Sequence, residues 1–164
     1  MIKAKVENML NKQINAELYS AYLYLSMSAY YESINLTGFA HWMRVQAKEE
    51  VGHAMRIYNH IVERSGRVNL SSISNPPVSW KSPLNAFEEA YKHEQKVTKM
   101  IHDLVELSRR ENDYAAESML QWFIDEQVEE ENQTEQIVRK LKLIKDSTNG
   151  LFMLDHELSK RKEE

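Results

Sequence analysis

Four long stretches of this chain repeat apolar residues at steps of three and four, and an aperiodic stretch separates the second from the third. Such steps place side chains on one face of a helix. The separating stretch, residues 65–82, contains Asn75-Pro76-Pro77 and ends in Ser82 before Pro83, which is typical of a loop. Extended at about 3.3 Å per residue, it spans roughly 55–60 Å, more than the ~40 Å of a neighbouring helix. The loop can therefore run the length of a bundle and start the third helix parallel to the second.

These stretches predict an all-α fold, a four-helix bundle with a long crossover between its second and third helices. Short breaks after the first and third helices make each pair an antiparallel hairpin. Leu151, Leu154 and Leu158 add a short amphipathic C-terminal helix. The sequence thus predicts a single domain over residues 1–164, with the bundle over about 4–145 and the fifth helix over about 148–162.

The composition excludes several classes of function. The absence of cysteine rules out disulfides, thiolate zinc sites and thiol catalysis. A formal net charge of −4 disfavours nucleic-acid binding and suits attraction of cations. No apolar run approaches the ~20 residues that a membrane span needs, and the start lacks the apolar segment of a secretory signal. We expect a cytoplasmic protein with neither a nucleic-acid nor a membrane partner.

Polar side chains occupy positions on the inner stripes where apolar residues are expected. Adding 77 to positions 17, 50 and 53 gives 94, 127 and 130, so the two hairpins look like two copies of one ligand-bearing pattern. Within each hairpin these positions lie at similar distances from the turn. The residues should therefore meet near the middle of the bundle; they are Glu17, Glu50, His53, Glu94, Gln127 and Glu130.

This cluster predicts metal binding. Buried carboxylates cannot all ionise together, so they must hold protons or place a cation between them. Oxygen-rich ligation with one imidazole favours iron or manganese over structural zinc. Glu50 is the candidate bridge between two ions. The competing interpretation is a non-catalytic helical scaffold whose carboxylates bind no metal.

At these residues the chain resembles the non-haem prokaryotic ferritins, over nearly its whole length. The resemblance is carried by Gln13-Ile14-Asn15-Ala16-Glu17-Leu18-Tyr19-Ser20-Ala21-Tyr22-Leu23-Tyr24-Leu25, by Trp42-Met43-Arg44, by Glu49-Glu50-x-x-His53-Ala54 and by Glu126-Gln127-Val128-Glu129-Glu130-Glu131. It implies a ferritin-like bundle with an intrasubunit di-iron centre.

The resemblance also implies a role for each site residue. One iron would be held by Glu17, Glu50 and His53. The second would be held by Glu50, Glu94 and Glu130, with Gln127 nearby. A third iron site would use Glu49, Glu126, Glu129 and Glu130, for which a solvated acidic face is the alternative. Tyr24 would lie beside the iron pair, either supplying an electron or a hydrogen bond or serving as a core tyrosine.

The function that the resemblance implies is iron storage and detoxification by a ferroxidase, an iron(II):oxygen oxidoreductase. Two Fe²⁺ ions would be oxidised by O₂ (or H₂O₂), and the Fe³⁺ would move to a ferric mineral. Storage implies a homo-oligomeric shell, typically of 24 copies, although some archaeal relatives assemble in a more open symmetry. The fifth helix would pack around a symmetry axis or simply cover the bundle end.

The main alternative within this fold is a haem-containing bacterioferritin. That family has a methionine haem ligand just before the Glu-x-x-His histidine and a histidine in the fourth-helix motif. Gly52 and Glu130 stand in those places here, so we expect no haem. The DNA-binding mini-ferritins build their metal site between subunits and lack this ligand set on one chain. A di-iron hydroxylase or radical-generating reductase would share the site chemistry, but such chains are usually longer.

Overall fold

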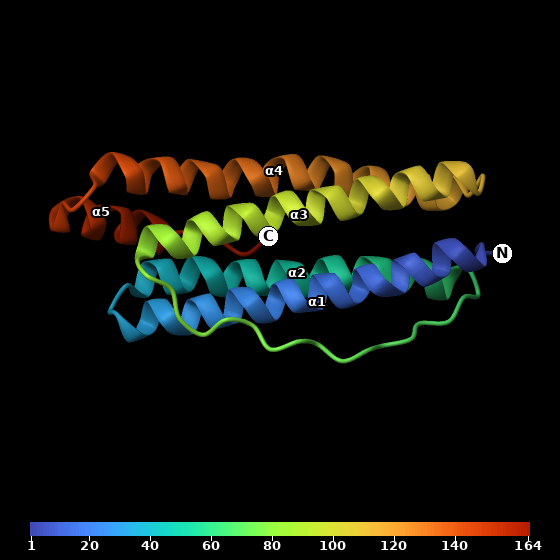
Figure 1. Ribbon diagram of the computed structural model, residues 1–164, viewed down its shortest axis with the longest axis horizontal. Coiled ribbons are helices and arrows are strands. Elements are labelled where there is room, and N and C mark those ends of the chain that lie inside the picture. The colour runs from blue at the N-terminus through green and yellow to red at the C-terminus, as the bar shows by residue number, and fades with distance from the viewer.

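The computed structural model describes all 164 residues, in five helices and no strands. α1 and α2 form one antiparallel pair and α3 and α4 the other, while the segment between α2 and α3 runs along α1 for the length of the bundle (Figure 1). The predicted fold class and the long crossover are confirmed. The helices are α1 (Ala4–Ser33), α2 (Thr37–Glu63), α3 (Pro83–Arg110), α4 (Tyr114–Ile144) and α5 (Thr148–Leu158).

Local chemistry sets the helix ends in both hairpins. Asn35 and Asn112 occupy the two hairpin turns with φ of 61° and 54°, a left-handed conformation that asparagine tolerates better than most residues. The Ser82 hydroxyl caps α3 by accepting a hydrogen bond from the backbone N–H of Asn85 at 3.0 Å. Asp113 caps α4 in the same way, through the N–H of Ala116 at 3.1 Å. Such caps satisfy backbone donors that have no partner within the helix.

Side chains of α1 fasten the crossover segment along the bundle. Asn11 donates a hydrogen bond to the carbonyl of Arg67 at 3.0 Å and accepts one from the N–H of Asn69 at 2.7 Å. Further along, Asn15 donates to the carbonyl of Ser72 at 3.0 Å. The segment is therefore held along α1 by polar contacts although it has no helix or strand of its own.

Two apolar cores lie on either side of a buried polar layer. Toward α5, one core contains the aromatic residues Tyr24, Tyr31, Phe39, Trp42 and Phe87. Toward the other end, the second core contains Leu10, Ile14, Ile57, Ile101 and Phe123. The layer between them consists mainly of Gln13, Glu17, Gln46, Glu50, His53, Glu94, Gln127 and Glu130, all at most 5% exposed. The apolar cores thus keep this layer at mid-depth in the bundle.

α5 packs on the start of α2. The backbone N–H of Phe39 donates a hydrogen bond to the Asp155 carboxylate at 3.0 Å. Gly38 makes the approach possible, because a Cβ there would lie 1.8 Å from the carbonyl oxygen of Asp155. None of the five helices combines the length and apolar character that a bilayer span requires.

The predicted end of the fifth helix, near residue 162, is wrong. α5 ends at Leu158, and the last residues continue in the same direction along α2, so that the C-terminus lies near the middle of the bundle (Figure 1). Contacts to α2 explain the difference. Arg161 donates to the carbonyl of Trp42 at 3.2 Å, and its own carbonyl oxygen lies 2.7 Å from Nε2 of His41.

Candidate metal centre

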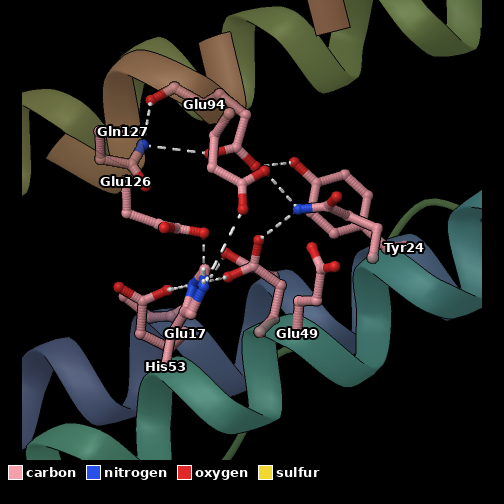
Figure 2. Close-up of polar contacts among 12 residues, drawn as sticks. Glu17, Tyr24, Glu49, His53, Glu94, Glu126 and Gln127 are labelled. Atoms are coloured by element: carbon pink, nitrogen blue, oxygen red, sulfur yellow. Dashed lines mark hydrogen bonds and ion pairs between the residues drawn. The ribbon is translucent and has the colours of Figure 1, made fainter. Parts of the chain in front are cut away.

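Six polar side chains meet at one level of the bundle interior, as the sequence predicted. Glu17 comes from α1, and Glu50 and His53 come from α2. Glu94 comes from α3, and Gln127 and Glu130 come from α4. Side chains from both hairpins point toward one another there, including Glu17 and His53 from one hairpin and Glu94 from the other (Figure 2).

The ligand atoms form three overlapping groups, each able to hold one metal ion. The atoms of each group lie within 4.8 Å of one another. Glu50, His53 and Glu130 each belong to two groups, so a carboxylate can be shared between neighbouring ions. The groups are Glu17–Glu50–His53, Glu50–Glu94–Glu130 and His53–Glu126–Glu130.

Hydrogen bonds orient the half of the cluster on the first hairpin. Gln13 donates to Oε1 of Glu17 at 2.8 Å, and Nδ1 of His53 lies 3.0 Å from Oε2 of Glu50. Nδ1 of His53 is 3.8 Å from Oε2 of Glu17, which is too long for a hydrogen bond. That Glu17 oxygen is buried and has no hydrogen-bond partner. A buried carboxylate oxygen without a partner is unfavourable, and a cation beside it would satisfy it.

The other half is oriented by α1, α3 and α4 together. The Tyr24 hydroxyl donates to Oε1 of Glu94. The Gln127 amide nitrogen donates to Oε2 of Glu94 at 3.1 Å and lies 3.1 Å from Oγ1 of Thr98. Both Glu94 oxygens therefore accept a hydrogen bond, and Gln127 serves here as a donor to a candidate ligand.

Burial and neighbouring negative charge raise the pKa values of three carboxyl groups in the cluster. Burial raises the pKa of Glu50 and of Glu130 well above the usual carboxyl range, and the charge of Glu94 raises both further. Burial also raises the pKa of Glu94, to about 7, against the opposing hydrogen bonds from Tyr24 and Gln127. These carboxyls retain protons because they lie close together away from water. Cations bound among them would take the place of those protons.

His53 has the opposite influence on its neighbours. Burial lowers the pKa of His53, but contacts with Glu126, Glu17 and Glu50 outweigh it, and the net pKa is raised. Burial likewise raises the pKa of Glu17, yet the interaction with His53 outweighs it and the net pKa is lowered. Without bound metal, the imidazolium thus acts as the counter-ion of the Glu17 carboxylate.

The flank of the centre only partly matches the predicted third site. Oε1 of Glu126 lies 3.6 Å from Nε2 of His53, and Glu126 belongs to one of the three groups. Glu49 belongs to none of them, and its Oε2 pairs with Arg161 at 2.7 Å. Glu129 is exposed and accepts a hydrogen bond from Gln133 at 2.9 Å. The structure therefore brings Glu126 to the cluster and leaves Glu49 and Glu129 apart from it.

A cleft on this flank reaches the centre from outside. Its volume is about 240 Å³, and its lining includes His53, the one cluster residue that it exposes. The lining also carries acidic side chains, which attract cations toward the opening. The lining residues include Lys48, Glu49, His53, Trp122, Glu126 and Glu163.

Sequence reasoning missed three residues that orient the ligands. Gln13 and Gln46 each precede a cluster glutamate by four positions, Glu17 and Glu50, and each donates to that glutamate. This spacing puts both side chains on one helix face, so a glutamine four residues before each glutamate was an available signal. Arg161 reaches the centre from the C-terminal tail, and no periodicity indicates it.

The fold and the buried polar layer together show a helical-bundle protein with carboxylate-rich groups suited to binding metal cations. The family model for the ferritin-like domain matches residues 7–144. The chain is 42% identical to a bacterial non-heme ferritin of Bacteroides fragilis, covering 98% of this chain and 100% of that one. A bacterial non-heme ferritin of Staphylococcus aureus is 37% identical, with coverage of 98% and 97%. The chain belongs to the ferritin family.

Solved structures agree with this assignment. An Archaeoglobus fulgidus ferritin engineered into a closed form is 52% identical, covers all of both chains and gives a TM-score of 0.99. A ferritin from the same organism, described as an open pore ferritin, is also 52% identical and gives a TM-score of 0.98 over 99% of this chain and 100% of that chain. The resemblance to non-haem prokaryotic ferritins is confirmed, and these matches support a role in iron storage.

Proposed function

We propose that this protein is a ferroxidase that oxidises Fe²⁺ with O₂ and stores the product as a ferric mineral inside a shell of identical subunits. The observation that carries the proposal is the sharing of Glu50 between two ligand groups, one of which contains the unpartnered oxygen of Glu17. Two groups with a common carboxylate can hold two metal ions close together, so that a pair of Fe²⁺ ions can together supply two electrons to one O₂.

Each cluster residue has a role in this proposal. Glu17, Glu50 and His53 bind one Fe²⁺, and Glu50 with Glu94 and Glu130 binds the other. Gln127 contributes no charge, which keeps its half of the site less anionic and helps the product leave. Carboxylate oxygens favour hard cations such as Fe³⁺. Tyr24 holds Glu94 in place through its hydroxyl.

Iron is the substrate of this site and also the cargo of the shell. Each Fe²⁺ gives up one electron, so a pair delivers two electrons to one O₂, which takes up two protons from water and becomes H₂O₂. The carboxyls of Glu50, Glu94 and Glu130, whose pKa values are raised, release their protons as Fe²⁺ binds.

A third iron position on the flank involves Glu126 with Glu130, and Glu49 and Glu129 as more distant ligands. Glu126 is already near the cluster. Glu49 must leave Arg161 before it can take part, and Glu129 must turn from the surface. In this proposal the third position fills after the central pair, because Glu49 and Glu129 still have to join Glu126 and Glu130 there.

The shell is proposed from the family rather than from the single chain. α5 and its neighbours present exposed apolar side chains, among them Leu143, Phe152 and Met153, which suit contact with further copies. We expect a hollow homo-oligomer, typically of 24 subunits, to elute in size-exclusion chromatography far ahead of a single chain. Elution as a monomer would contradict storage in a shell.

Anaerobic loading with Fe²⁺ followed by exposure to O₂ tests the ferroxidase directly. Wild-type protein should oxidise two Fe²⁺ per chain rapidly, as followed by absorbance of Fe³⁺. Glu50→Ala and His53→Ala should each slow this phase at least tenfold, since supporting residues alone change metal affinity or activity by about 10–100-fold. Glu135→Ala removes a surface carboxylate that pairs with Arg139 and serves as control.

An unchanged rate of Fe²⁺ oxidation in Glu50→Ala and in His53→Ala would contradict the proposed ferroxidase and favour the non-catalytic helical scaffold. A Soret band in the purified protein would instead identify a bound haem and favour the bacterioferritin alternative.

A further inference from the structure

The C-terminal tail places one arginine against α2, next to the polar layer. The guanidinium of Arg161 lies over the ring of Trp42, 4.0 Å from its centroid, and donates to the Trp42 carbonyl at 3.2 Å. The side chain of Arg161 is 12% exposed. Stacking and hydrogen bonding together give this guanidinium one defined position, which a flexible surface arginine lacks.

From this position Arg161 reaches a buried glutamine of the site. Nη2 of Arg161 donates to Oε1 of Gln46 at 2.8 Å and to Oε2 of Glu49 at 2.7 Å. Gln46 is fully buried. Its amide nitrogen donates in turn to Oε1 of Glu50 at 3.0 Å and to Oε2 of Glu130 at 2.6 Å. A continuous chain of hydrogen bonds therefore joins the C-terminal tail to two carboxylates that each belong to two ligand groups.

The chemistry of the neighbours fixes which way the Gln46 amide faces. A guanidinium only donates hydrogen bonds, so it can bind the oxygen of the amide but not its nitrogen. The amide oxygen must therefore face Arg161, and the amide nitrogen must face Glu50 and Glu130. Without Arg161, the buried amide oxygen would lose its donor, and the amide would lose the contact that opposes its rotation.

We propose that Arg161 is a positioning residue that sets the places of Glu50 and Glu130 by orienting the Gln46 amide, so that the C-terminal tail completes the iron site. This inference rests on the proposed function, because it assigns a role toward the same ligands. The ion pair with Glu49 anchors the guanidinium. The aligned amide then holds the two shared carboxylates at the spacing that two neighbouring cations need.

Binding of Co²⁺ measures this effect without depending on iron oxidation. Co²⁺ is titrated into the full-length protein anaerobically, and its visible absorption reports both occupancy and coordination geometry. Arg161→Gln should weaken binding at the central sites about tenfold or more, within the range of about 10–100-fold seen for residues behind the ligands, and should alter the absorption spectrum. Lys162→Gln removes the same charge from the next, exposed residue and should leave both unchanged.

The variant Gln46→Ala tests whether Arg161 acts by positioning the Gln46 amide or only by docking the C-terminal tail on α2. If Arg161 acts through Gln46, then Arg161→Gln should cause little further loss of Co²⁺ affinity in the Gln46→Ala background. An equal loss in both backgrounds, or wild-type affinity and spectrum in Arg161→Gln, would overturn the proposal. Wild-type protein that binds Co²⁺ as expected but fails to oxidise Fe²⁺ would refute the ferroxidase and leave this inference standing.

Discussion

At the scale of single residues, the centre is defined by acids that cannot all be charged. The pKa of Glu94 is raised to about 7, first by burial, and those of Glu50 and Glu130 are raised further for the same reason. The folded protein without metal therefore binds protons that the unfolded chain does not. Proton and cation compete for the same oxygens.

This competition predicts how stability depends on pH. Below the ordinary carboxyl pKa, near 4.5, both the folded and unfolded states hold the Glu94 proton, and no stability is lost. Between that value and about 7, the unfolded chain ionises this group while the folded state keeps its proton, so the free energy of unfolding falls until the loss is complete above about pH 7. Without metal, the melting temperature should therefore decrease from pH 5 to pH 8 more in wild-type protein than in Glu94→Gln.

Added Co²⁺ should raise the melting temperature of wild-type protein more at pH 8 than at pH 5, because fewer protons oppose it at the higher pH. Calorimetry at both pH values provides the measurement. Equal stabilisation at the two pH values would show that these carboxyls are not the cation ligands.

At the scale of helices, one aspartate joins the ends of three of them. Asp113 caps α4 through Ala116 and forms an ion pair with Arg64, just after α2, at 2.7 Å. The backbone N–H of Lys3, at the start of α1, lies 3.4 Å from the same carboxylate. Asp113 is 3% exposed, so this contact holds both hairpins together at the end of the bundle opposite α5.

Asp113→Ala should therefore destabilise the bundle, because a lost helix cap costs about 0.5–2 kcal/mol. A further loss should follow because Arg64 would be left without its partner. Asp103→Ala is the matched control, since the Asp103–Lys99 pair is exposed and such pairs contribute about 0.2–1 kcal/mol. Denaturant unfolding measures both variants. Equal effects of the two substitutions would contradict the role assigned to Asp113.

The Asp113 pair also has a pH signature. Burial raises its pKa, but the hydrogen bond from Arg64 and those from the backbone outweigh it, and the net pKa is below 3.8. Its contribution is therefore present above that ordinary value and is lost as the pH falls through the lower folded pKa. The difference in stability between wild-type protein and Asp113→Ala should shrink only below about pH 4.

At the scale of the whole molecule, the fifth helix connects the bundle end to the metal centre. Gly38 lets α5 approach α2 closely, and the tail that follows α5 delivers Arg161 to Gln46. Correct seating of α5 is thus a condition for the geometry of a site that lies well away from it. The link passes through contiguous hydrogen bonds and packed side chains.

Gly38→Ala should separate α5 from α2, because the added methyl would lie 1.8 Å from a backbone oxygen of Asp155. Amide hydrogen exchange of residues 148–164 should become faster, and Co²⁺ affinity should fall as in Arg161→Gln. Gly52→Ala is the control, because its Cβ would meet nothing within 4 Å. That change should be neutral or stabilise by up to about 1 kcal/mol. Unchanged exchange in Gly38→Ala would show that α5 docks by other contacts.

Features that repeat along the chain were predictable from the sequence, and contacts between distant segments were not. Polar residues on apolar stripes predicted that Glu17, Glu50 and Glu94 meet, because helical periodicity fixes both face and depth. Loop length predicted the crossover. The end of α5 and the role of Arg161 depend on contacts across more than a hundred residues, which no local pattern records.

Because the crossover lies between the two hairpins in the sequence, the first hairpin is synthesised before the second. A ribosome releases α1 and α2 before α3 and α4, and the first pair alone carries the group of Glu17, Glu50 and His53. The groups that contain Glu130 need α4 as well. A nascent first hairpin can therefore offer one ligand group at most, and under the proposed function two Fe²⁺ ions can be bound side by side only after the two halves have closed.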